Sequence, residues 1–106
     1  MECKVKFADE KLKQAFEELK SSDEQLCHGI ERALNKISQN AFCGRNVRKR
    51  LMPKELVKKY MIDNLWVYNL SDGWRLLYSI GSDKIEVIAV ILHWMRHKDY
   101  ERMFKF

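Results

Sequence analysis

Long apolar stretches and secretion signals are missing from this sequence. The longest uninterrupted apolar run, residues 87–92, is far shorter than the roughly 20 residues that a membrane-spanning helix needs, and it suits a strand. Residues 1–4 lack the charged-then-apolar layout of a signal peptide. We therefore expect a cytoplasmic protein without membrane association.

Cysteine, proline and glycine are also scarce. The chain has three cysteines at wide spacing (Cys3, Cys27 and Cys43), one proline and four glycines. No CxxC pair occurs, which argues against a zinc site and against a disulfide scaffold and predicts three reduced thiols. No cluster of metal ligands is visible, so we expect neither metal nor cofactor. With 106 residues, 46% of them apolar, the chain is expected to form one globular domain over residues 1–106.

Positive charge is present and unevenly distributed. Residues 1–44 sum to −1, whereas residues 45–106 sum to +6. The segment 45–59 alone holds seven basic residues against the single acidic Glu55. A local excess of this kind attracts polyanions through counterion release, so it favours nucleic acid as a partner. The alternative is a solvated basic loop with no partner.

Two amphipathic helices are predicted in the first half of the chain. Residues 4–7 alternate as a short edge strand, and Asp9 can cap the helix that follows. Ser22 and Gln25 have the spacing of a capping box at the start of the second helix. Apolar residues recur at helical spacing at Leu12, Ala15, Phe16 and Leu19, and again at Leu26, Ile30, Ala33, Leu34 and Ile37. Because few polar residues join the helices, we expect an antiparallel hairpin whose apolar stripes form core.

The second half is predicted to be mainly β. After the second helix ends at 40–44, Pro53 can sit in the first turn of a short third helix. The apolar side of that helix would be Leu56, Val57, Tyr60 and Met61. Strands are predicted at 65–70, 74–80 and 85–92, turns at 71–73 and 81–84, and a short terminal helix or tail at 97–104. The order predicts an α+β fold: an N-terminal helical hairpin packed on one face of a small, mainly antiparallel twisted sheet, with the other face partly open.

One hairpin carries a family resemblance. Residues 65–78 resemble the central hairpin of RelE/ParE-type toxins, in which a glycine turn precedes an aromatic–Arg–aliphatic–aliphatic–Tyr strand, here WRLLY at 74–78. The HKDY run at 97–100 is similar to the basic–aromatic tail of that superfamily. The order of elements also agrees, so the resemblance covers nearly the whole chain and implies a RelE-like fold.

The resemblance implies the toxin of a type II toxin–antitoxin system. The best-known family activity is cleavage of mRNA in the ribosomal A site, which inhibits translation, while other members poison DNA gyrase. Both kinds are normally held inactive by an antitoxin. For this chain it implies a RelE-like mRNA interferase, a metal-independent endoribonuclease, with a cognate antitoxin, mRNA and the ribosome as partners.

Three residues are the candidates for catalysis. Cleavage of this type needs a proton acceptor for the 2′-hydroxyl, cations beside the charged phosphorane, and an acid for the leaving oxygen. Arg75 corresponds to the family's strand arginine that contacts the scissile phosphate. His97 would act as acid or base, and Tyr100 as stacking platform or proton relay. The alternatives are an Arg75 paired with an internal carboxylate and a surface tail with no site.

Further basic residues are the candidates for RNA binding: Arg45, Arg48, Lys49, Arg50, Lys54, Arg96 and Lys98. The most active ribosome-dependent members carry two lysines at the positions of Trp66 and Tyr68. Those aromatic side chains could stack on bases or fill the core, and a basic residue at 48–50 could replace a lysine. His28, in a helix, and His93, at a strand end, are weaker candidates.

Three functional hypotheses follow. The first is a ribosome-associated endoribonuclease. The second, motivated by the missing lysines, is a gyrase inhibitor without nuclease chemistry. The third is a catalytically silent family member that only binds an antitoxin or nucleic acid.

Overall fold

A computed structural model describes residues 2–82 and 86–105. In these residues the α-helices are α1 (Glu10–Ser22), α2 (Glu24–Gln39), α3 (Lys54–Tyr60) and α4 (His97–Phe104). The strands are β1 (Lys4–Phe7), β2 (Arg45–Asn46), β3 (Trp66–Asn69), β4 (Trp74–Ser82) and β5 (Val87–Arg96). Short 3₁₀ turns are η1 (Ala41–Cys43), η2 (Lys49–Leu51) and η3 (Ser71–Gly73). None of the helices in the described ranges is both long and apolar enough to cross a membrane.

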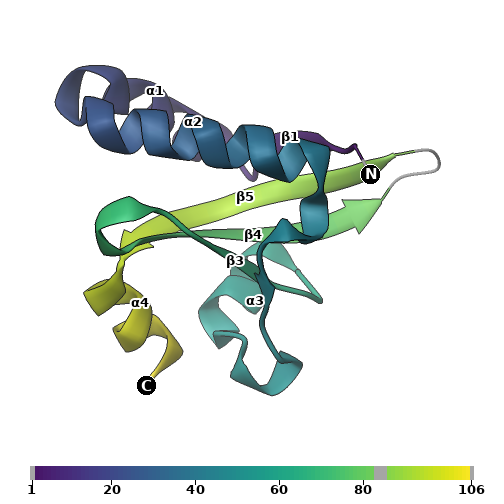
Figure 1. Cartoon of the computed structure of the whole chain (residues 1–106). Coiled ribbons are helices and arrows are strands. Elements are labelled where there is room, and N and C mark those ends of the chain that lie inside the picture. Colours follow the sequence, from purple (N-terminus) through teal and green to yellow (C-terminus); the bar gives the residue numbers. More distant parts are fainter. Residues whose placement is uncertain (1, 83–85, 106) are drawn as a thin grey trace.

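One sheet organises the molecule. Its strand order is β1-β5-β4-β3-β2. The pair β1–β5 is parallel, and the other neighbouring pairs are antiparallel. The prediction of an α+β fold with a helical hairpin on a mainly antiparallel sheet is confirmed (Figure 1).

Aspartates cap both helices of the hairpin. The Leu12 backbone N–H donates to Asp9 Oδ1 at 2.8 Å, which confirms the predicted cap of α1. The predicted capping box at Ser22 is wrong, because the cap of α2 is Asp23, whose Oδ1 accepts from Leu26 N–H at 3.1 Å. Asp23 is also the C-cap of α1, so the chain reverses at one residue and Ser22 remains inside the first helix.

The hairpin covers one face of the sheet. Helices α1 and α2 lie side by side across β1, β5 and β4 (Figure 1). The buried core on this face consists of Leu26, Ile30, Ala33 and Ile37 from α2 together with Leu76, Tyr78, Ala89 and Ile91 from the sheet. The helix α1 packs outside this layer and contains no fully buried residue.

The opposite face is more covered than the sequence predicted. The chain between β2 and β3, including η2 and α3, packs there together with α4 (Figure 1). The second core consists of Val47, Met52, Leu56, Leu65, Val67, Leu77, Leu92, Met95, Tyr100 and Phe104. Leu76 and Leu77 are neighbours on β4, so their side chains point to opposite faces of the sheet. Both are fully buried, which requires other elements to cover each face.

Several predicted boundaries differ from the structure. Pro53 lies one residue before α3 as its N-cap, and Met61 leaves the apolar side because its backbone turns left-handed (φ 55°), which leaves it 86% exposed. Strand β5 continues to Arg96 because its later residues still pair with β4. Of the predicted turn at 81–84, the first two residues belong to β4, and 83–85 lie outside the described residues.

Candidate functional site

The junction of β4, β5 and α4 gathers the three candidate catalytic side chains. Arg75 Nη2 lies 3.1 Å from His97 Nδ1, and the Arg75 guanidinium carbon lies 5.7 Å from the centre of the Tyr100 ring. The His97 and Tyr100 rings stack with their centres 6.4 Å apart and an interplanar angle of 23°. Helix α4 begins directly after β5, so His97 follows a strand that pairs with the strand of Arg75.

The hydrogen bonds at this junction set the tautomer of His97. A guanidinium group can only donate, so a hydrogen bond between these two atoms requires the tautomer of His97 in which Nδ1 accepts. The ring hydrogen then sits on Nε2, which lies 3.2 Å from a carboxylate oxygen of Glu101. No predicted role included Glu101, although its spacing of four from His97 on a helix could have suggested the contact.

Arg45 joins the cluster from the far edge of the sheet. Its Nη2 donates to the Tyr100 hydroxyl oxygen at 2.9 Å, across 55 positions of sequence. The short strand β2 is held in place just before Arg45, because Gly44 N–H donates to the buried Tyr78 hydroxyl at 3.0 Å. Arg45 was predicted only as an RNA-binding residue; the structure puts it in contact with a candidate catalytic one.

Arg75 has no carboxylate partner in the part of the chain that the structure describes. Its guanidinium contacts the Trp74 carbonyl oxygen at 3.4 Å, His97 and the Tyr100 ring. The side chain is half-buried, and its contacts with the described residues are with these dipoles and the ring. A half-buried cation without an ion pair is a favourable binding point for an anion, because the anion gains a charge-assisted hydrogen bond.

Of the remaining basic candidates, all but Arg96 lie between β2 and β3 or on α4. Arg48 lines a hollow of about 150 Å³ beside Arg45 and Tyr100, and Arg50 and Lys54 line an adjoining hollow of about 330 Å³. Lys49 and Lys98 are exposed on η2 and α4.

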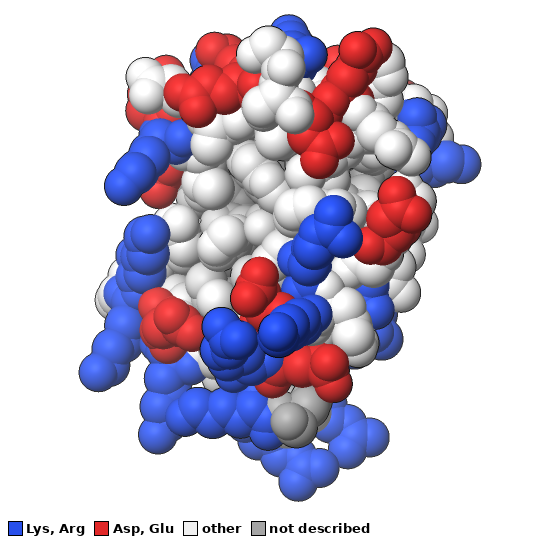
Figure 2. All heavy atoms as spheres, turned by 90° about the vertical axis from the view of Figure 1, so that its left-hand side faces the viewer, with Lys and Arg blue, Asp and Glu red and all other residues white. Residues whose placement is uncertain are grey.

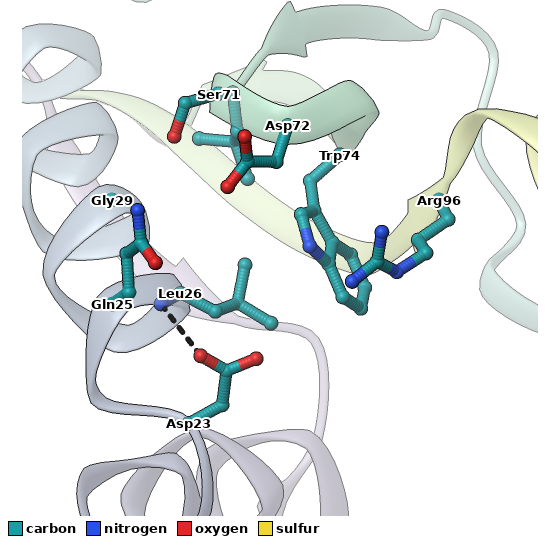
Figure 3. A pocket seen from close by; sticks show the side chains of 9 residues that line it. Asp23, Gln25, Leu26, Gly29, Ser71, Asp72, Trp74 and Arg96 are labelled. Atoms are coloured by element: carbon teal, nitrogen blue, oxygen red, sulfur yellow. Dashed lines mark hydrogen bonds between the residues drawn. The ribbon is translucent and has the colours of Figure 1, made fainter.

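Arg96 does not belong to the candidate site. It alternates with Met95 along β5 and pairs with Trp74, so its side chain points toward the helical hairpin. Its guanidinium carbon stacks 4.8 Å from the Trp74 ring and lines a small pocket with Asp23 and Asp72 (Figure 3). The prediction that grouped Arg96 with the other RNA-binding residues is therefore not supported by its position.

Trp66 and Tyr68 also point away from the candidate site. Both pack against the hairpin core, and Trp66 stacks on Tyr78 with ring centres 6.4 Å apart. Of the two roles considered for these aromatics, filling the core is the one their positions support. The β3 residue opposite Arg75 is Asn69, so no lysine of β3 faces the cluster.

The weaker candidates lie elsewhere. His28 pairs with Glu24 on the exposed side of α2 at 4.0 Å. His93 is exposed within β5, not at its end, and its Nδ1 lies 2.8 Å from the Trp94 carbonyl oxygen. Among the described residues, no three His, Cys, Asp or Glu side chains gather where they could hold a metal ion.

The arrangement can bind and polarise a phosphate. It offers the guanidinium of Arg75, a second guanidinium at Arg45, an imidazole with an unprotonated nitrogen and a phenol within one cluster. These groups can supply positive charge, proton acceptance and proton donation.

Comparison of the chain with protein-family models, with curated proteins and with solved structures gave no match.

Proposed function

We propose that this chain is a metal-independent mRNA endoribonuclease and the toxin of a toxin–antitoxin pair. The observation that carries the proposal is the convergence of Arg75, His97 and Tyr100, with Arg45 bonded to the Tyr100 hydroxyl. These residues come from three separate stretches of sequence and meet at the junction of β4, β5 and α4, where His97 is exposed, Arg75 is half-buried and Tyr100 is buried. The resemblance of the 74–78 strand to RelE/ParE toxins supports the same function.

The proposed reaction is attack of a ribose 2′-hydroxyl on the adjacent phosphorus. The phosphate draws the Arg75 guanidinium away from His97, and Nδ1 of His97 then takes the 2′-hydroxyl proton. Arg75 and Arg45 stabilise the negative charge of the phosphorane. The Tyr100 hydroxyl gives a proton to the departing 5′-oxygen, which leaves a 2′,3′-cyclic phosphate and a 5′-hydroxyl.

A second candidate is a silent family member that binds nucleic acid without cleaving it. The observation in its favour is that β3 presents Asn69, and no lysine, opposite Arg75. With no lysine at that position, cleavage would depend on His97 alone as the proton acceptor. The cluster would still bind phosphate, because that needs only the two arginines.

The test compares two arginines that lie on opposite faces of the sheet. Wild type, Arg75→Ala and Arg96→Ala are induced in a test bacterium, and mRNA 5′ ends are mapped over the first minutes. We expect new ends inside translated codons with wild type and with Arg96→Ala. Arg75→Ala should lower the cleavage rate by about 10²–10³-fold, as loss of a preorganised charge does. Circular dichroism of the purified variants verifies that both remain folded.

Other results would redirect the proposal. Equal cleavage by wild type and Arg75→Ala would remove Arg75 from the reaction. Growth arrest with intact mRNA would favour a protein target such as gyrase, and DNA damage signalling would identify that case. Harmless expression without cuts would leave the silent binding member.

A further inference from the structure

A groove leads away from the candidate site between α4 and the chain from β2 to β3 (residues 47–65), which we call the connector. It consists of the two adjoining hollows of about 150 and 330 Å³, which share Leu51 and Phe104. The first opens at Arg45 and Tyr100, and the second lies between the start of α3 and the last turn of α4. We call the two together the basic groove; its charged lining is Arg45, Arg48, Arg50, Lys54 and Lys105 against Glu55.

Within the described residues, the cations of the basic groove have no carboxylate partner at ion-pair distance. In the described residues the ion pairs are made by Lys4, His28, His97 and Arg102, none of which lines the groove. Figure 2 shows that Lys and Arg dominate the lower end of the face it presents, the end where α4 and the connector lie in Figure 1. Uncompensated cations along a groove favour a polyanion over a neutral or cationic partner.

Apolar side chains line the groove together with the cations, and we call Leu51, Met103 and Phe104 its apolar floor. Leu51 is 43% exposed there, and Phe104 and the partly buried Met103 lie beside it. A groove lined by both cations and apolar side chains suits a single strand, whose phosphates contact the cations and whose base faces cover the apolar floor. An RNA duplex keeps its base faces stacked inside and could not cover Leu51 in this way.

We propose that the basic groove binds single-stranded RNA on one side of the scissile phosphate. Phosphates would pair with Arg48, Arg50 and Lys54, and a base would pack on Leu51. The placement of this RNA beside the scissile phosphate rests on the proposed function. Arg45 and Tyr100 connect the groove to the cluster of Arg75. The binding itself needs no cleavage, so the two proposals can be tested separately.

The experiment measures binding of a fluorescent, uniformly 2′-O-methylated oligoribonucleotide, which has no 2′-hydroxyl to attack. Fluorescence anisotropy is recorded over a range of salt concentrations for wild type, for Arg50→Glu with Lys54→Glu, and for Lys11→Glu with Lys13→Glu on exposed positions of α1. The two double variants change the net charge equally. We expect the groove variant to lose affinity by about tenfold or more and its salt slope to fall by about 1.4, at about 0.7 for each phosphate contact in a single strand.

A second pair of variants tests the apolar floor. Leu51→Ser is compared with Met61→Ser, which removes an exposed apolar side chain outside the groove. Loss of base packing should weaken binding by about three- to tenfold in Leu51→Ser without a change in salt slope. Met61→Ser should bind as wild type does.

Equal weakening by both charge-reversed pairs would overturn the proposal, since only net charge would then matter. Binding of duplex and single-stranded RNA with equal affinity would overturn the single-strand assignment. Failure of wild type to bind the oligonucleotide, with groove-dependent binding of poly-glutamate instead, would assign the groove to an acidic protein. Groove-dependent RNA binding in a chain that cuts no mRNA in cells would refute the nuclease and leave this inference standing.

Discussion

At the scale of single residues, Gly44 and Tyr78 join the end of the helical hairpin to the edge of the sheet. The Tyr78 hydroxyl donates to the Ala41 carbonyl at 2.7 Å and accepts from Gly44 N–H at 3.0 Å. Tyr78 is fully buried, and these two hydrogen bonds offset the free-energy cost of removing its hydroxyl from water. Arg45, which donates to the Tyr100 hydroxyl, follows Gly44 directly in the sequence.

Gly44→Ala should destabilise the protein through close contact. A methyl group there would lie 2.6 Å from the Tyr78 hydroxyl oxygen and 2.8 Å from the Val67 carbonyl oxygen. We expect the free energy of unfolding in urea to fall by about 1–3 kcal/mol. At Gly81 an added methyl meets nothing within 4 Å, so Gly81→Ala should stay within about 0.5 kcal/mol of wild type. Equal effects at the two glycines would contradict this account.

Tyr78 should make stability decrease at high pH. Burial raises the pKa of its hydroxyl well above the ordinary value of about 10. Above that ordinary value the unfolded chain releases the proton while the folded chain keeps it, so the folded state binds more protons. The free energy of unfolding should then fall by up to about 1.4 kcal/mol per pH unit, and below pH of about 10 this contribution should be constant.

The measurement compares wild type with Tyr78→Phe by urea unfolding from about pH 8 to about pH 11. At the lower pH the variant should be less stable by about 1–3 kcal/mol, because the partners of the hydroxyl remain unpaired. The gap should narrow toward the higher pH, since only wild type loses stability through this group. A gap that stays constant would mean that Tyr78 ionises equally in both states.

At the scale of elements, the hairpin depends on one shared residue. Asp23 ends α1 and caps α2, whereas Ser22, which has the better sequence pattern, donates its hydroxyl to the Glu18 carbonyl at 3.1 Å within α1. A capping box requires the serine to lie outside the helix, and the tight reversal leaves no room for that. Local pattern alone could not reveal how many residues the turn uses.

Asp23→Ala should therefore cost more than Ser22→Ala. Loss of the Asp23 carboxylate leaves the Leu26 N–H without its acceptor, and we expect about 0.5–2 kcal/mol of destabilisation in thermal or urea unfolding. Ser22→Ala should change stability by at most about 0.5 kcal/mol, because its exposed hydroxyl caps nothing. A larger loss of stability in Ser22→Ala than in Asp23→Ala would show that Ser22 caps α2, as the sequence pattern predicted.

Alternation along a strand predicts which residues share a face of the sheet, but only within that strand. The grouping of Arg75 with Leu77, opposite Trp74 and Leu76, follows from period two and agrees with the two cores. The faces of Trp66 and Tyr68 depend on the register of β3 against β4, in which Asn69 lies opposite Arg75. Register is set by pairing between strands, so one strand's residues did not reveal it.

At the scale of the whole molecule, two cores share one sheet. Strand β4 contributes Leu76 to the hairpin side and Leu77 to the side of α3 and α4. Neither core can lose its packing without disturbing strands that support the other. We therefore expect the two cores to unfold together, as one domain spanning residues 1–106 would.

Truncations in the two cores test this coupling. Ile37→Ala on the hairpin side and Leu65→Ala on the connector side each remove a fully buried side chain, and each should lower stability by about 2–5 kcal/mol. The three tryptophans border the hairpin core, so their fluorescence reports that side. In Leu65→Ala the tryptophan and far-ultraviolet circular dichroism transitions should coincide. Separate transitions would show that the cores unfold independently.

Local information in the sequence was enough for the α+β order, the Asp9 cap and the hairpin stripes, because these depend on residues a few positions apart. It left residues 97–104 open between a helix and a tail, and the structure has the helix α4 there. Only the tertiary structure brought Arg45 to Tyr100 and Arg75 to His97, and only it turned Arg96 toward the hairpin. Those outcomes depend on strand register and on how the connector and α4 pack over the second face. Both are set by contacts between distant segments, which periodicity along the chain does not encode.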